Sequence, residues 1–328
     1  MSVADALARY REIDLPNTPI GLRSVIAIDV DSEARTARVA MTDGPLTGVP
    51  VLVKDNIEAE GLPCTAGSRA LVGVPVTRDA PVVTRLRRAG AVVIGSANLS
   101  EWANIRSVRS SSGWSAVGGL VANPWALDRS AGGSSSGSGA AVAAGIVSMA
   151  VGTETDGSIT CPAALNGVVG VKPTVGLVPT EGIVPVSGSQ DTPGPLARCV
   201  DDATLMLAVL ADDPGLIARS HSIDVRSLRV GIVDAWRTGH PDTDALFDAT
   251  VASVRSLFSS VTPSSIEKTT DEASADEFSV LIHELKSDLD AYLSARCETS
   301  GPRSIQGTGP LRPRHIRIGA NKWGSSLP

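Results

Sequence analysis

The sequence predicts an α/β fold in which sheet layers are covered by helices. Two short apolar runs, 50–53 and 91–95, have the composition of buried strands, and a helix-like segment at 79–90 separates them. Strands that are apolar at every position are typical of sheets covered on both faces. A chain of 328 residues is long enough for about two domains or for one large α/β unit.

The other elements follow in chain order. Residues 1–20 predict a short helix and a proline-containing link. In the helix at 79–90, Asp79 is the expected N-cap and Gly90 the expected stop. After residue 190 the pattern becomes conventional and predicts helices at 200–211, 242–257 and 271–295, with a strand at 228–233.

The composition argues against several classes of protein. The chain has 29 Lys and Arg against 35 Asp and Glu, a net charge of −6, so a dedicated nucleic-acid binder is not expected. The longest apolar run, Gly139–Gly152, is too short and too rich in glycine to cross a bilayer. The N-terminus carries charges where a signal peptide needs apolar residues, so we expect a cytoplasmic protein with no membrane segment.

Common metal, disulfide and catalytic motifs are missing from the sequence. The cysteines form no C-x-x-C pair, which favours reduced thiols over zinc sites or disulfides. All four histidines follow residue 220, and no phosphate loop occurs. The four cysteines are Cys64, Cys161, Cys199 and Cys297.

The segment 110–190 is unusually poor in charge and rich in small residues. Within it, 131–145 consists of Gly, Ala and Ser apart from Val142, and it continues into apolar, helix-like sequence. We therefore expect a buried loop that opens a closely packed helix rather than a flexible linker. Its six charged residues are Asp128, Arg129, Glu154, Asp156, Lys172 and Glu181.

Two lysines are candidates for buried positions: Lys54 at the end of a predicted strand, and Lys172, before Pro173, in this weakly charged segment. Burial disfavours the charged form of lysine, and a neutral lysine can serve as general base for a serine hydroxyl. Two other interpretations of Lys54 remain open at this point. It could extend its ammonium group to solvent from the strand end, or it could form a structural ion pair with Asp55.

Several separate motifs carry a resemblance to a known family. The run GGSSSGSGAAVAAG…GTETDGSITCPAALNGVVGVKPTVGLV spans 132–178, GVPVLVKDN precedes it at 48–56, and VSGSQDTPGPLARCVDDATLMLAVLA follows at 186–211. Together they resemble the amidase signature family over roughly residues 20–300, and the GTETDGSI and SQDTPGP wording is most similar to its peptide-amidase-like branch. The resemblance implies the amidase-signature fold, a central mixed, twisted β-sheet covered by α-helices.

The resemblance also implies a Ser-cisSer-Lys triad. Its nucleophile is Ser158, its bridging serine is Ser134, which follows a cis peptide bond, and its base is Lys54. No cofactor and no metal belong to this chemistry. The implied oxyanion hole consists of backbone N–H groups, those of Thr155, Asp156, Gly157 and Ser158.

The implied function is hydrolysis of carboxylic amides to the acid and ammonia through an acyl-enzyme. Small-molecule amides or peptides with C-terminal amides are the expected substrates, without a nucleic-acid or membrane partner. One alternative is a truncated, catalytically impaired amidase homologue. A further alternative is the amidase-type component of a transfer-RNA amidotransferase, which would require a partner subunit.

Residues near the triad suit other roles. Ser135 and Ser136 suit either helix capping and packing or contact with the triad or substrate. Asp156 suits substrate binding or a loop hydrogen bond, and Asp191 is expected to anchor a turn before a proline. Cys161 is expected to be a small buried side chain.

Two departures from the family stand out. Thr160 occupies a position where many members have arginine. The resemblance ends near residue 300, whereas family members usually continue well beyond this point. We therefore expect an amidase domain at 1–300 that is incomplete at its C-terminal end, and a disordered, unrelated tail at 301–328 that contains basic but no acidic residues.

Overall fold

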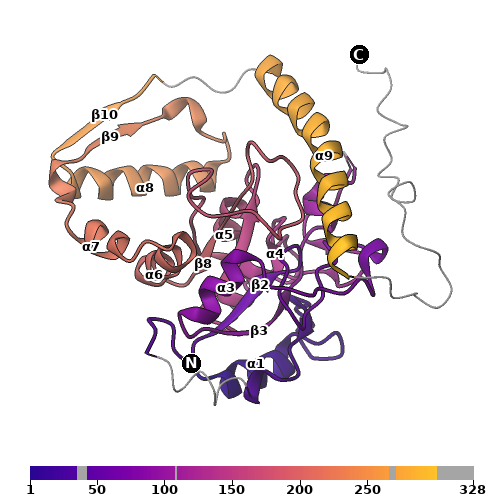
Figure 1. Ribbon diagram of the computed structural model, residues 1–328. Helices are drawn as coiled ribbons and strands as arrows, with labels where there is room; N and C mark the ends of the chain where they lie inside the picture. The colour runs from indigo at the N-terminus through magenta and orange to yellow at the C-terminus, as the bar shows by residue number, and fades with distance from the viewer. Residues whose placement is uncertain (35–42, 108, 266–270, 301–328) are drawn as a thin grey trace. The chain divides into compact units, whose positions relative to one another are not determined.

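The fold is described from a computed structural model of the chain (Figure 1). The segment 301–328, where the sequence predicts a disordered tail, lies outside the described residues. For residues 271, 272 and 297–300 only the backbone is described. The described residues are 1–34, 43–107, 109–265 and 271–300.

Contacts between residues divide the chain into two units. The larger unit comprises Met1–Pro214 and Leu281–Pro328, and the smaller unit comprises Gly215–Val280. All residues of the predicted site belong to the larger unit.

A six-stranded mixed sheet forms the centre of the larger unit (Figure 1). Its strand order is β1-β3-β2-β6-β8-β7. The three middle strands β3, β2 and β6 are parallel, whereas β1, β8 and β7 join by antiparallel pairing. The predicted α/β class with a mixed sheet is confirmed. The bounds are β1 Val25–Ile28, β2 Pro50–Lys54, β3 Val92–Ala97, β6 Met149–Glu154, β7 Val169–Gly170 and β8 Thr192–Ala197.

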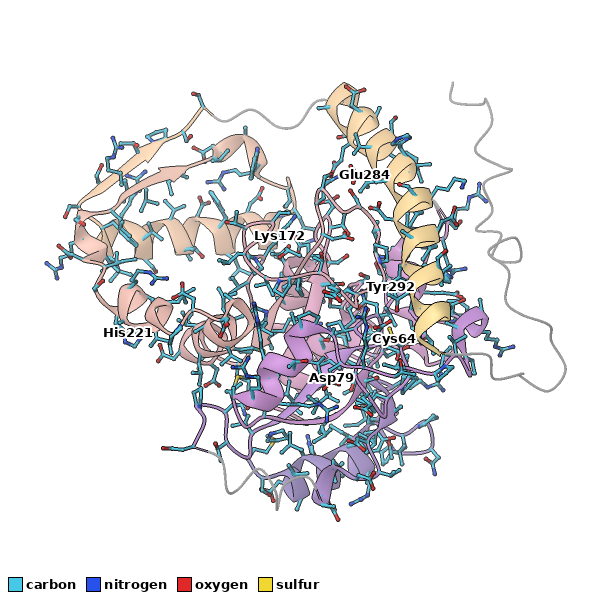
Figure 2. The ribbon with its side chains drawn as sticks, in the orientation of Figure 1. Cys64, Asp79, Lys172, His221, Glu284 and Tyr292 are labelled. Atoms are coloured by element: carbon cyan, nitrogen blue, oxygen red, sulfur yellow. The ribbon has the colours of Figure 1, made fainter. Side chains whose placement is uncertain are left out.

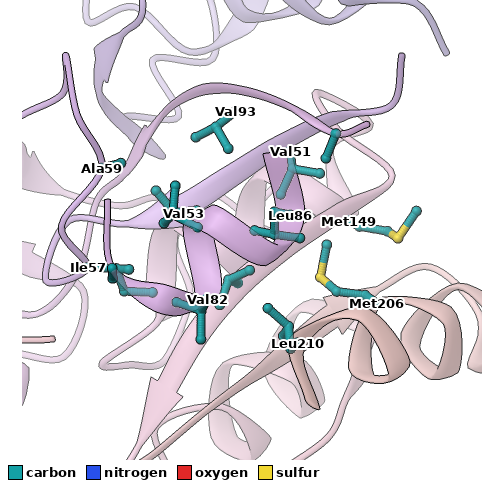
Figure 3. Packing of buried hydrophobic residues seen from close by; sticks show 14 of the residues in the cluster. Val51, Val53, Ile57, Ala59, Val82, Leu86, Val93, Met149, Met206 and Leu210 are labelled. Carbon is teal, nitrogen blue, oxygen red and sulfur yellow. The ribbon is translucent and has the colours of Figure 1, made fainter. Parts of the chain in front are cut away.

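Helices cover both faces of this sheet. On one face, α3 (Pro81–Arg88) and α6 (Val200–Ala211) pack on Val51 and Val53 of β2, with Met149 and Met206 in the same cluster (Figure 3). On the other face, α1 (Val3–Ile13) and α4 (Ser136–Ala143) pack on Leu52. Successive residues of a strand point to opposite faces, which explains why β2 is apolar at every position before Lys54.

The remaining elements of the larger unit are short. A two-stranded antiparallel pair, β4 and β5, lies outside the main sheet. The helix α5 follows β6 after a short loop and begins two residues after the predicted nucleophile. The bounds are β4 Trp114–Ser115, β5 Gly119–Leu120, α5 Thr160–Asn166, and 3₁₀ turns at Arg69–Leu71 and Glu101–Asn104.

The smaller unit is built around a βαβ motif. Its two strands, β9 and β10, pair in parallel, and α8 connects them. The strand predicted at 228–233 and the helix predicted at 242–257 correspond to β9 and α8. The bounds are α7 Gly215–His221, β9 Arg229–Ile232, α8 Pro241–Leu257, β10 Ser260–Pro263, and 3₁₀ turns at Val225–Ser227 and Asp234–Trp236.

The long helix α9 (Asp271–Ser300) contributes buried polar groups to the larger unit. Arg296 donates hydrogen bonds of 2.7 Å to the carbonyl of Cys64 and 2.9 Å to that of Val74. The Tyr292 hydroxyl donates to Glu58 at 2.9 Å and lies 3.7 Å from the Cys64 sulfur (Figure 2). These bonds fix the C-terminal half of α9 because each one satisfies a polar group in a buried setting.

The helix α3 begins differently from the prediction. Its N-cap is Ala80, without a side-chain cap, so the assignment of Asp79 as N-cap is wrong. Asp79 instead accepts the N–H of Glu60 at 2.8 Å and forms an ion pair with Arg87 at 3.0 Å. Pro81 at the first helical position needs no acceptor for an N–H, which makes a side-chain cap less necessary. Gly90, with φ +87°, ends the helix as predicted.

The packing of α4 explains its small residues and gives a stability prediction. A Cβ on Gly137 would lie 2.2 Å from the carbonyl oxygen of Ser24 and 2.5 Å from the nitrogen of Asn98. We expect Gly137→Ala to lower the free energy of unfolding by about 1–3 kcal/mol or more, because the backbone would have to move. Urea unfolding measures this change.

The matched control is Gly139→Ala on the same helix. A Cβ there would lie 3.1 Å from its nearest neighbour, the side-chain nitrogen of Asn166. The higher helix propensity of alanine, about 1 kcal/mol over glycine, should offset much of this tighter contact. Equal destabilisation by the two substitutions would contradict the close approach at Gly137.

None of the described helices is long and apolar enough to cross a membrane.

Candidate active site

Lys54 is the last residue of β2 and is fully buried. Its Nζ donates hydrogen bonds to Ser134 Oγ at 2.8 Å, to Thr153 Oγ1 at 2.9 Å and to the Thr153 carbonyl at 3.2 Å. Asn56 donates to the same threonine hydroxyl at 3.0 Å. Parallel pairing of β2 with β6 brings Lys54 and Thr153 to the same end of the sheet. The structure therefore joins two of the predicted triad residues directly.

The environment of Lys54 favours its neutral form. Burial lowers the pKa of Lys54 to about 7, and the negative charges of Asp191 and Glu154 only partly oppose this effect. The alternative ion pair with Asp55 does not form, since that carboxylate accepts bonds from Thr65 instead. Solvent exposure of the ammonium group is also excluded by the complete burial of Lys54. A neutral amine near pH 7 is suited to accept a proton.

The loop before α4 presents Ser134 to Lys54. The Gly133–Ser134 peptide bond is cis, and the Ser134 carbonyl accepts the N–H of Ser100 at 3.0 Å. The following hydroxyl, Ser135 Oγ, bonds both the carbonyl and the N–H of Thr153, at 3.1 and 3.2 Å. Ser135 therefore ties this loop to β6. It occupies the N-cap position of α4, but its side chain does not cap the helix. The expected buried loop opening a close-packed helix is confirmed.

Ser158 lies on a short loop between β6 and α5. Its carbonyl accepts the N–H of Ser135 at 3.0 Å, which places it beside the Ser134 loop. Ser158 is 8% exposed, and its hydroxyl makes no hydrogen bond within the described part of the chain. No bond joins its hydroxyl to that of Ser134 among the described contacts. The two serines are thus neighbours through the backbone, with the Ser158 hydroxyl available to another group.

The same loop leaves backbone donors available. Within the described residues, the N–H groups of Asp156, Gly157 and Ser158 have no acceptor. Glu154 holds the end of the loop, because its Oε2 accepts the N–H groups of Ile159 at 2.6 Å and the next residue at 2.9 Å. Gly157 has φ +74°, a conformation that glycine adopts without strain. Such a row of unpaired N–H groups can stabilise a negatively charged oxygen.

Asp191 connects this loop to a neighbouring turn. It accepts a hydrogen bond from the Thr155 hydroxyl and the N–H groups of Val186 and Ser187. It therefore anchors a turn as expected, and it also holds the loop of Ser158, a contact that sequence spacing did not indicate. Burial raises the pKa of Asp191 above its ordinary value, against the hydrogen bonds that the carboxylate accepts.

A cavity of ≈ 60 Å³ adjoins the Lys54 side of the site. Asn56, Thr153, Thr155 and Asp191 contribute polar groups to it, and the apolar segment 183–186 lines another part. Ser134 and Ser158 do not line this cavity. It has room for small molecules such as water, which needs about 10–15 Å³ by this kind of measure.

The remaining site-adjacent residues have simpler roles. Cys161 is exposed, so the prediction of a buried side chain is wrong: it lies in the first turn of α5, whose outer face is open. Ser136 is buried, and its hydroxyl lies 3.5 Å from the Ser134 carbonyl. Thr160 contacts Glu154 through its N–H and hydroxyl. Asp156 is exposed.

The described residues contain no group of three or more His, Cys, Asp or Glu side chains that could hold a metal ion. Cys64, Cys161 and Cys199 are free thiols. The side chain of Cys297 lies outside the described residues.

Comparison with solved structures supports the fold assignment. The native peptide amidase from Stenotrophomonas maltophilia aligns with a TM-score of 0.81 and 37% identity. The alignment covers 96% of this chain and 74% of that chain.

Curated relatives carry two kinds of name. An Arabidopsis thaliana protein named Probable amidase is 48% identical over 171 residues, 52% of this chain and 33% of its own length. The A subunit of the glutamyl-tRNA(Gln) amidotransferase of Symbiobacterium thermophilum is 48% identical over 168 residues, 51% of this chain and 33% of its own. The chain thus spans about a third of these relatives. The family model Amidase matches residues 10–315, and the chain belongs to the amidase family.

Proposed function

We propose that this protein is an amidase that hydrolyses carboxylic amides through Lys54, Ser134 and Ser158. The observation that carries the proposal is the 2.8 Å hydrogen bond between a fully buried lysine amine and the Ser134 hydroxyl. A buried lysine bonded only to neutral oxygen atoms is suited to act as a base. The unpaired N–H groups of the neighbouring loop supply the second requirement of acyl transfer, stabilisation of an oxyanion.

The proposed reaction passes two protons in relay, one from Ser158 to Ser134 and one from Ser134 to Lys54. Neutral Lys54 takes the proton of Ser134, Ser134 takes that of Ser158, and Ser158 Oγ attacks the amide carbonyl. The tetrahedral oxygen carries the negative charge against the N–H groups of residues 155–158. The C–N bond then breaks, ammonia or an amine leaves with the proton returned through Ser134, and water hydrolyses the acyl-enzyme. The bond between the two serine hydroxyls forms when substrate is bound, since catalytic hydrogen bonds tighten in that complex.

Peptides with C-terminal amides are the proposed substrate class. This proposal is based on the likeness to the peptide amidase from Stenotrophomonas maltophilia, at 37% identity over 96% of the chain. The test is ammonia release from aliphatic, aromatic and peptide amides. A monodisperse, folded protein that releases no ammonia from any of them would contradict the proposal and favour the catalytically impaired alternative.

Activity should depend on pH through Lys54. Because burial lowers the pKa of this amine to about 7, its neutral fraction rises as the pH increases to that value and levels off above it. We therefore expect kcat/KM to rise about tenfold per pH unit below pH 7 and to become flat above it. Initial rates between pH 5 and 9 measure this profile, and a rate independent of pH in that range would contradict a lysine base.

A second candidate function is suggested by the relatives that are named as components of a glutamyl-tRNA(Gln) amidotransferase. In that case the same triad would release ammonia from glutamine for use by a partner protein. Glutamine hydrolysis that depends on an added partner protein would favour this candidate. Efficient hydrolysis of peptide amides by the isolated chain would favour the amidase proposal.

A further inference from the structure

Lys172, the lysine of the weakly charged segment 110–190, contacts the loop that carries Ser158. Its Nζ donates a hydrogen bond of 2.6 Å to the carbonyl oxygen of Thr155 and lies 3.8 Å from Oε1 of Glu154. The side chain comes from the segment between β7 and β8 (Figure 2). It is 35% exposed. Its ammonium group therefore touches the loop backbone and does not touch the Lys54–Ser134 pair.

The bond to Thr155 acts on the next residue through the peptide group that the two share. The carbonyl of Thr155 and the N–H of Asp156 belong to one planar trans peptide, so they point in opposite directions. A cation on the oxygen fixes this plane and leaves the N–H facing away from Lys172. The same cation polarises the amide and makes its N–H a stronger donor, as in a hydrogen-bond chain.

Three carbonyl groups of this loop, those of Thr155, Gly157 and Ser158, accept hydrogen bonds, whereas the N–H groups of residues 156–158 have no acceptor within the described residues. The Gly157 carbonyl accepts the N–H of Cys161 at 2.8 Å, and the Ser158 carbonyl accepts a backbone N–H at 3.0 Å. The Thr155 carbonyl differs from these two because its partner is a charged side chain. Lys172 is therefore placed to strengthen one specific donor, the N–H of Asp156.

We infer that Lys172 is a positioning residue that orients and polarises the Asp156 N–H toward the negative charge formed on the substrate oxygen. This inference rests on the proposed amidase function. Lys172 acts through the peptide group and does not touch the substrate. A positive charge behind the donor stabilises the substrate oxygen more when it is an oxyanion than when it is a neutral carbonyl oxygen. Lys172 therefore lowers the energy of the transition state more than that of the bound substrate.

The test compares Lys172→Met with the wild-type chain. The substitution removes the ammonium group and keeps a side chain of similar length. We expect kcat for amide hydrolysis to fall about 10- to 100-fold with little change in KM, because the lost interaction is made in the transition state. Lys172→Arg, which keeps a cationic donor, should recover most of the lost kcat. Lys286→Met, at an exposed position of α9, is the control substitution.

A second variant separates catalysis from folding. Lys172→Met alone leaves the buried Glu154 carboxylate without this cation, and we expect the free energy of unfolding to fall. The double variant Lys172→Met/Glu154→Gln removes that charge and keeps an acceptor for the N–H of Ile159. We expect it to melt at a higher temperature than Lys172→Met and to remain as slow in kcat.

Two results would overturn the inference and leave the amidase proposal intact. One is wild-type kcat in Lys172→Met, while Ser158→Ala is inactive. The other is recovery of kcat in the double variant together with its stability, which would make Lys172 a purely structural residue. If the wild-type chain releases no ammonia, the proposed function fails first, and the inference fails with it.

Discussion

Replacing Ser158 by alanine should reduce kcat/KM for amide hydrolysis by about 10⁴-fold or more, because the reaction loses its nucleophile. The hydroxyl is bonded to no other described group, so the substitution breaks no hydrogen bond of the fold. The hydrogen bond from the Ser135 N–H to the carbonyl of residue 158 joins two backbone groups, so it remains in the variant. Ammonia release from a peptide amide measures the effect, and thermal unfolding should be nearly unchanged.

The control for this prediction is Ser220→Ala, an exposed serine of the smaller unit. Its hydroxyl bonds only a carbonyl of its own helix. It should retain wild-type activity. Ammonia release by Ser158→Ala at a rate near that of Ser220→Ala would exclude Ser158 as the nucleophile.

Replacing Lys54 by methionine should have the second largest effect, a loss of about 10³- to 10⁴-fold in kcat/KM. The variant loses both the general base and the hydrogen bond that orients the Ser134 hydroxyl. Methionine fills a similar volume without an amine. Lys54→Arg should be similarly inactive, because its guanidinium stays protonated and cannot act as a base. Activity in Lys54→Arg would show that a cation, and not a base, is required at this position.

Stability provides an independent readout for Lys54. Its pKa is lowered from 10.5 in the unfolded chain to about 7 in the folded protein. The unfolded chain therefore binds more protons between these values, and the free energy of unfolding should rise with pH across that interval. The rise should be smaller in Lys54→Met. Urea unfolding of the two proteins at pH 7 and pH 9 measures this difference. An equal change in the free energy of unfolding between the two pH values would contradict the lowered pKa of Lys54.

The central part of the fold follows from local sequence patterns. The apolar runs before Lys54 and Ser96 are strands of the sheet, and the helices α6 and α8 begin and end within a residue of the predicted bounds. The hydrophobic pattern of these segments is regular, and the residues that begin and end each one are recognisable in the sequence. Their local preferences agree with the environment that tertiary packing gives them.

The strand β8 shows why other parts could not be predicted. It contains Pro193 and Pro195, which normally argue against a strand with neighbours on both sides. The Val171 N–H donates to the Pro195 carbonyl. The backbone nitrogen and carbonyl of Pro195 therefore point toward the side of β8 where β7 lies, and β7 is only two residues long. The missing N–H is therefore tolerated. This arrangement depends on the neighbouring strands and is not visible in the segment itself.

The candidate site likewise contains residues that the sequence indicated and residues that it did not. The resemblance to a family indicated Lys54, Ser134 and Ser158, and the structure places the first two in contact. It did not indicate Thr153, which binds Lys54 from 99 residues away, or the carbonyl contact of Lys172. Such partners are brought together by strand pairing and by loops after β6 and β7. The residue types and their spacing in the sequence do not identify these partners.

The most direct test of the proposed mechanism is the reaction with a fluorophosphonate probe, which phosphonylates an activated serine. Ser158 Oγ would form the bond to phosphorus, fluoride would leave, and the proton would pass through Ser134 to Lys54. Peptide mass spectrometry should find the phosphonyl group on Ser158, at a rate that rises with pH up to about pH 7, following the pKa of Lys54. Labelling of another residue, or equal labelling of Lys54→Met, would contradict a nucleophile activated by this lysine.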